Sequence, residues 1–75
     1  MIHHTAIVDP TATIHKTAWI GEWARVEAGV MVGKRAIVGS AAWVETGAVI
    51  EEGAIVKAGT IVPAHSTYPI PRMEE

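Results

Sequence analysis

The sequence predicts an all-β protein built as a parallel solenoid, in which short strands stack coil upon coil. Three observations indicate this fold: a six-residue period of aliphatic residues, a small residue two places before most of them, and glycines confined to the segments between. β-Branched residues favour strands, and Leu, which is common in helical cores, is absent. The period comprises eleven β-branched aliphatic residues: Ile2, Val8, Ile14, Ile20, Val26, Val32, Val38, Val44, Ile50, Val56 and Val62.

Each expected strand is a triplet of a small, an outward and an aliphatic residue, from 6–8 to 60–62 in steps of six. The small and aliphatic members point to the same side because they are two positions apart. A turn follows each triplet, and all seven glycines stand one or three residues after an aliphatic member, where glycine tolerates left-handed backbone. Every unit buries residues at the same two positions of the six-residue period. Successive units therefore cannot pair as hairpins, but they can form coils that stack on one another.

This hexad resembles the hexapeptide-repeat family, which includes bacterial acyltransferases and γ-class carbonic-anhydrase-like proteins. The resemblance covers residues 2–65 and implies a left-handed parallel β-helix, a triangular prism with three hexads per coil. The chain then makes about three and a half coils of 18 residues, and residues 18 apart lie stacked about 4.8 Å apart. We expect a β-helix over residues 1–65 and a tail or cap over 66–75, where Pro69 and Pro71 leave the hexad.

Length and charge limit the classes of partner. A monomer of 75 residues without cysteine buries only roughly 60% of its unfolded surface, so we expect oligomerisation to stabilise it. The family resemblance implies a homotrimer. A net charge of −2 argues against nucleic-acid binding. Nothing at the N-terminus resembles a signal peptide, and no apolar run approaches about 18 residues, so we expect no membrane association and a cytoplasmic location.

Outward residues of the prism form three columns. The first is Met1, Trp19, Ile37 and Ile55; the second is Ile7, Arg25, Trp43 and Ile61; the third is Thr13, Met31 and Val49. Apolar columns of this kind mark interfaces, and we expect the first to be buried between subunits. Trp23 belongs to a turn, and its role is left open.

Two charged ladders stand at the corners. Asp9, Glu27 and Glu45 stack on successive coils, and Lys16 stacks under Lys34 with Arg35 beside it. Like charges in register repel, so each ladder needs a compensating partner. One hypothesis pairs the basic corner of one protomer with the acidic ladder of the next. The other has Lys16, Lys34 and Arg35 bind an anion, with Trp19 stacking on a base or a pantetheine arm.

The leading functional hypothesis is a minimal homotrimer that binds a small phosphate- or nucleotide-like anion in its inter-subunit grooves without catalysis. The family resemblance implies an alternative, an acyltransferase that uses acyl-CoA and has His15 as general base, with Arg72 as a phosphate contact. A purely structural trimer is the third possibility. A zinc site of the carbonic-anhydrase type is not expected, because no histidine pair has the family's five-residue spacing.

Overall fold

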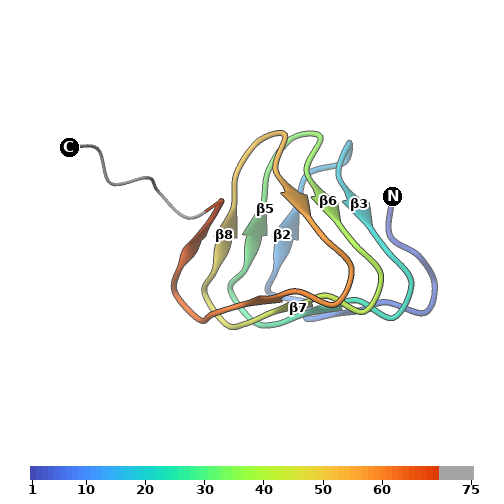
Figure 1. Ribbon diagram of the computed structural model, residues 1–75, viewed down its shortest axis with the longest axis horizontal. Coiled ribbons are helices and arrows are strands. Elements are labelled where there is room, and N and C mark those ends of the chain that lie inside the picture. The colour runs from blue at the N-terminus through green and yellow to red at the C-terminus, as the bar shows by residue number, and fades with distance from the viewer. Residues whose placement is uncertain (70–75) are drawn as a thin grey trace.

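The computed structural model describes residues 1–69 and confirms the all-β parallel β-helix (Figure 1). These residues form eleven two-residue strands and no helix, and so no helix that could cross a membrane. The strands are β1 (Ile7–Val8), β2 (Thr13–Ile14), β3 (Trp19–Ile20), β4 (Arg25–Val26), β5 (Met31–Val32), β6 (Ile37–Val38), β7 (Trp43–Val44), β8 (Val49–Ile50), β9 (Ile55–Val56), β10 (Ile61–Val62) and β11 (Thr67–Tyr68).

Three parallel sheets form the sides of the prism. The first face has the order β3-β6-β9, the second β1-β4-β7-β10, and the third β2-β5-β8-β11. Every pairing joins residues 18 apart, as in Trp19 with Ile37 and Ile37 with Ile55. The three predicted outward columns are therefore confirmed, and Ile2 extends the first face by a bridge to Ile20.

The core consists of the inward aliphatic and small residues, as the six-residue period predicts. From Ala18 to Val56 every one of them is at most 8% exposed, and Val62 is 1% exposed. No polar or charged side chain is buried within residues 1–69. Packing therefore accounts for the inward positions, and any binding chemistry must come from the corners and the outward columns.

The corners use two kinds of turn. In the upper coils the third corner residue has positive φ, in some cases a glycine and in others Trp23 (φ 62°), Arg35, Ala41 or His65. Its amide bonds the coil below, as when Ala41 N donates to Glu22 O at 2.8 Å. Only four of the seven glycines have positive φ. The other three allow the next coil to approach: a Cβ at Gly39 would lie 2.6 Å from Ala58 N.

The three corners of the first coil use threonine instead. Thr5, Thr11 and Thr17 stand there, and each hydroxyl accepts the backbone N–H of the residue 18 positions later at 2.9–3.0 Å. The residue two places before each threonine accepts that threonine's own amide: His3, Asp9 or His15. In the first coil a threonine hydroxyl thus accepts the corner amide of the coil above, whereas in the upper coils a backbone carbonyl accepts it.

The solenoid continues three residues past the expected boundary at residue 65. Thr67 and Tyr68 form β11, which pairs with β8, and Tyr68 packs against the core. The hexad spacing explains this, since Tyr68 follows Val62 by six residues with Ser66 two places before it. Arg72 and the rest of the expected tail after Pro69 lie outside the described residues.

Candidate functional site

The basic corner, defined by Lys16, Lys34 and Arg35, lies between the third and first faces. It forms the upper ridge of Figure 1, between the strands β2, β5 and β8 and the strands β3 and β6. Lys16 follows β2 and Lys34 follows β5, two strands that pair in the 18-residue register. The two exposed lysines are thus neighbours on successive coils, as expected. Trp19, 55% exposed, opens β3 directly after this corner.

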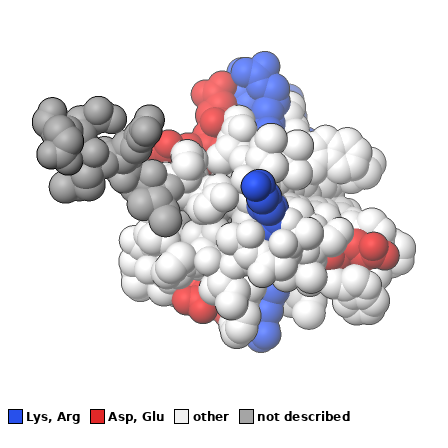
Figure 2. Space-filling view, in the orientation of Figure 1, with Lys and Arg blue, Asp and Glu red and all other residues white. Residues whose placement is uncertain are grey.

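A carboxylate that sequence reasoning missed stands directly above Lys34. Glu52 follows Lys34 by 18 residues, and its Oε2 lies 3.2 Å from Nη2 of Arg35. Acidic and basic groups accordingly lie side by side at the upper edge of Figure 2. Both side chains of this pair are more than 60% exposed, so the pair contributes little to stability. Within residues 1–69, neither Lys16 nor Lys34 has a carboxylate within 4 Å.

The acidic ladder bonds to its own chain. Oδ1 of Asp9 accepts the amide and the hydroxyl of Thr11. Oε1 of Glu27 accepts the amide and the hydroxyl of Thr46, at 3.0 and 3.1 Å. Oε1 of Glu45 accepts the amide of Ala64 at 3.1 Å. Each carboxylate therefore caps a turn of its own coil or of the next.

Two of these carboxyl groups have lowered pKa values. The backbone amide of Thr11, followed by its hydroxyl, lowers the pKa of Asp9 below its ordinary value of 3.8. The indole N–H of Trp43 is the largest cause that lowers the pKa of Glu27 below 4.5, and the groups of Thr46 add to it. Hydrogen bonds to the ionised form stabilise it, so both groups hold a full negative charge at neutral pH.

Arg25 and Trp43 form a cluster with Glu27 on the second face. The guanidinium carbon of Arg25 lies 5.1 Å from the centroid of the Trp43 ring, which is a cation–π distance. The indole N–H of Trp43 donates to Glu27 at 2.6 Å. The side chain of Trp43 therefore contacts both a cation and an anion of its own chain.

His15 lies in a turn beside the lysines, with its Nδ1 engaged. The amide of Thr17 donates to Nδ1 at 3.1 Å, and the hydroxyl of Thr17 lies 2.8 Å from the same atom. Because Nδ1 accepts, the neutral ring carries its proton on Nε2. A general base that acts through Nε2 needs the opposite tautomer. His3 makes the same bonds with Thr5, so this arrangement closes a turn at two corners of the first coil.

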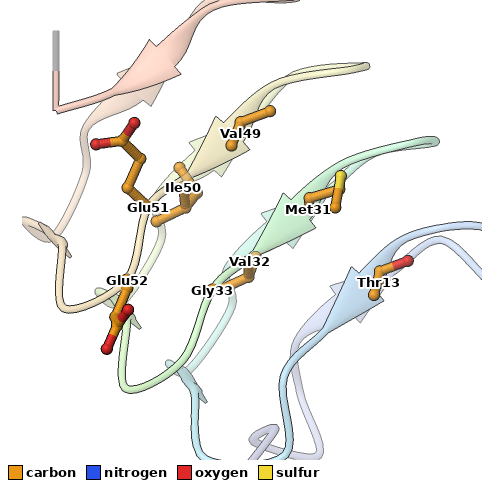
Figure 3. A pocket seen from close by; sticks show the side chains of 8 residues that line it. All are labelled: Thr13, Met31, Val32, Gly33, Val49, Ile50, Glu51 and Glu52. Carbon is orange, nitrogen blue, oxygen red and sulfur yellow. The ribbon is translucent and has the colours of Figure 1, made fainter. Parts of the chain in front are cut away.

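An open groove of about 460 Å³ runs along the third face (Figure 3). Thr13, Met31 and Val49, from three neighbouring strands, lie along it, and Glu51 and Glu52 stand at one edge. This apolar floor with an acidic edge disfavours an anion in the groove itself. The part of the basic corner that favours an anion is therefore the lower part, around Lys16 and Lys34. Within residues 1–69, no group of three or more His, Asp or Glu side chains could hold a metal ion.

No protein-family model, curated protein or solved structure matches this chain. The 18-residue register and the three-faced core are thus the observations that define its fold, and they are consistent with a hexapeptide-repeat β-helix.

Proposed function

We propose that this protein is a self-assembling, non-catalytic β-helix of the hexapeptide-repeat type that binds a small phosphate- or nucleotide-like anion at its basic corner. One observation carries the proposal. Lys16 and Lys34 stack on adjacent coils with no carboxylate within 4 Å among residues 1–69. The two upper members of the acidic ladder, Glu27 and Glu45, already accept hydrogen bonds from their own chain.

The chemistry of the corner suits a phosphate group. Two ammonium groups about 4.8 Å apart in register repel each other, and a phosphate between them replaces that repulsion with charge-assisted hydrogen bonds. Arg35 donates through one nitrogen to Glu52, which leaves further N–H groups of its guanidinium for an anion. The exposed indole of Trp19 offers a stacking surface for a base next to the corner.

Self-assembly is proposed through the first face. Its outward column of Met1, Trp19, Ile37 and Ile55 is exposed along its whole length, and a contiguous apolar surface of this kind marks an interface. A homotrimer, as the family resemblance implies, buries this column and places the basic corner at the edge of each interface. Aspartate at Ile37 is expected to dissociate the assembly in sedimentation velocity, whereas aspartate at Met31 on the third face is not.

Thermal unfolding with inorganic phosphate and with ATP tests the binding site. A ligand at 100 times its dissociation constant stabilises the folded state by about 2.7 kcal/mol, which raises the Tm of a chain this size by roughly 10 °C or more. We expect this rise in the parent protein and in a Lys57→Ala control, which removes one exposed lysine at another corner. We expect it to disappear in Lys34→Ala.

Three results would overturn the proposal. The first is an absence of any response to phosphate and ATP in the parent. The second is an equal response in Lys34→Ala, and the third is loss of assembly in Lys34→Ala, which would favour pairing of the basic corner with a neighbouring protomer. Turnover of acetyl-CoA that is abolished by His15→Ala would replace binding with catalysis.

A further inference from the structure

The two ends of the prism differ in how well they cover the core. At the C-terminal end Val56 and Val62 are buried, and Tyr68 packs against the core. At the N-terminal end Ile2 is 46% exposed, and Val8 and Ile14 are only partly buried. The inward side chains of the first coil thus form an apolar triangle that residues 1–69 leave partly uncovered.

We propose that this N-terminal end docks against the N-terminal end of a second copy of the chain, related to the first by a two-fold axis perpendicular to the prism. This contact involves the end of the solenoid, whereas the assembly proposed above uses a side. It is therefore independent of the first face, but it uses Lys16, which also belongs to the proposed anion site.

The backbone of the first coil has an open edge at this end. The amides of Ile7 and Asp9 donate to the coil above at 2.8 and 2.9 Å, and those of Thr13 and His15 do so at 2.8 and 3.0 Å. In a parallel ladder the intervening residue faces the other way, so the amide of Val8 faces the open end. Two ends related by a two-fold axis set these strands antiparallel, which is a favourable arrangement for pairing exposed edges.

Charge selects one of the three ways to superpose the triangles. Asp9 stands at one corner of the first coil, His15 and Lys16 at the second, and His3 and His4 at the third. An axis through the first corner would place Asp9 opposite Asp9, and an axis through the second would place Lys16 opposite Lys16. An axis through the third corner places Asp9 of each copy opposite His15 and Lys16 of the other, so this contact occurs twice. Only the last register is complementary at both contacts.

The hydrogen bonds of the first coil leave suitable atoms for this contact. Oδ1 of Asp9 is engaged by Thr11, while Oδ2 accepts no hydrogen bond within residues 1–69. The neutral ring of His15 carries its proton on Nε2, because its Nδ1 accepts from Thr17, so Nε2–H can donate to a facing carboxylate. On the axis, the rings of His3 and His4 stack with centroids 4.5 Å apart, and this corner of the first coil holds no Lys, Arg, Asp or Glu side chain.

Cysteine cross-linking tests this register, because the chain has no native cysteine. His4, Ser40 and Ala58 lie at the same corner, in the first, third and last coils, and all three are exposed. We expect His4→Cys to form a covalent dimer under mild oxidation or with a short bismaleimide. Ser40→Cys, the matched control, is expected not to do so. Circular dichroism of each variant checks that the β-helix is retained.

A charge variant provides a second measurement on the cysteine-free chain. Asp9→Asn keeps the oxygen that caps Thr11 and removes the charge, so the fold is retained while the two charge contacts are lost. We expect the dissociation constant of the end-to-end contact, measured by sedimentation, to be about tenfold higher than in the parent. Glu45→Gln, at the same corner two coils higher, is expected to leave this association unchanged.

The proposal is overturned if His4→Cys yields no more covalent dimer than Ser40→Cys. It is overturned as well if the end-to-end association of Asp9→Asn is as strong as that of Glu45→Gln. It is also overturned if covalent dimers form only when His4→Cys and Ala58→Cys proteins are mixed. That result would mean head-to-tail stacking of the N-terminal end of one copy on the C-terminal end of the next.

Discussion

The indole N–H of Trp43 donates to the carboxylate of Glu27 at 2.6 Å, from the strand β7 to the corner one coil below. The same carboxylate accepts two bonds from Thr46, and Arg25 covers the indole ring. These contacts form one exposed network that joins Arg25 and Trp43 on the second face to Glu27 and Thr46 at the neighbouring corner. Trp19 on the first face makes no hydrogen bond through its indole within residues 1–69, which leaves that surface available for a partner.

Replacing Glu27 by Gln is expected to lower the Tm at pH 7, because the carboxylate accepts three hydrogen bonds as an anion. The folded-state pKa of Glu27 lies below its ordinary value of 4.5, so its stabilisation is complete above 4.5 and is lost as the pH falls through the folded-state pKa. The Tm values of parent and variant should converge as the pH falls below the folded-state pKa of Glu27. Glu22→Gln, whose carboxylate makes no hydrogen bond within residues 1–69, should show no such convergence.

Replacing Thr17 by Val is expected to destabilise the first coil. Its hydroxyl accepts the amide of Arg35 at 2.9 Å and bonds His15, and valine matches its shape without an acceptor. The loss of such a bond costs about 1 kcal/mol, or roughly 4–8 °C in Tm. Thr13→Val, at an exposed outward position whose side chain makes no hydrogen bond within residues 1–69, is the control. An equal effect at both positions would contradict the role of the corner hydroxyl.

Replacing Gly39 by Ala is expected to be severe, because the new Cβ would lie 2.6 Å from Ala58 N and 2.7 Å from Val56 O. The upper coil would have to move, and we expect a loss of about 4 kcal/mol or an unfolded chain. Gly53→Ala meets no atom within 4 Å, although its φ is +73°. Its cost should be about 1 kcal/mol, since Ala41 already adopts a φ of 60° at a corner. Urea unfolding of both variants compares the two effects.

Replacing Tyr68 by Ala is expected to lower the free energy of unfolding by about 2 kcal/mol, since the ring packs against the core at the C-terminal end. Tyr68→Phe keeps the ring and should stay close to the parent. Urea unfolding monitored by circular dichroism gives both values. An Ala variant as stable as the parent would show that Tyr68 does not help to cover the core.

The sequence by itself determined the repeat and the inward residues of the β-helix, and the family resemblance implied its three faces. It could do so because strand alternation and the six-residue period are local properties, and a single register of 18 residues then places every inward side chain. It even contained the signal for β11, since Ser66 and Tyr68 keep the period. Tyr68 departs from the β-branched series at this position, and its ring packs against the core.

Only the tertiary structure decided the partners of the outward side chains. Arg35 pairs with Glu52 one coil above, and Glu27 bonds Trp43 and Thr46, contacts that the sequence did not indicate. Long exposed side chains reach several neighbours on two coils, and their choice depends on rotamers and turn geometry that no period encodes. The Nδ1 acceptor role of His15 belongs to the same class, because it follows from the turn that brings the amide of Thr17 to the ring.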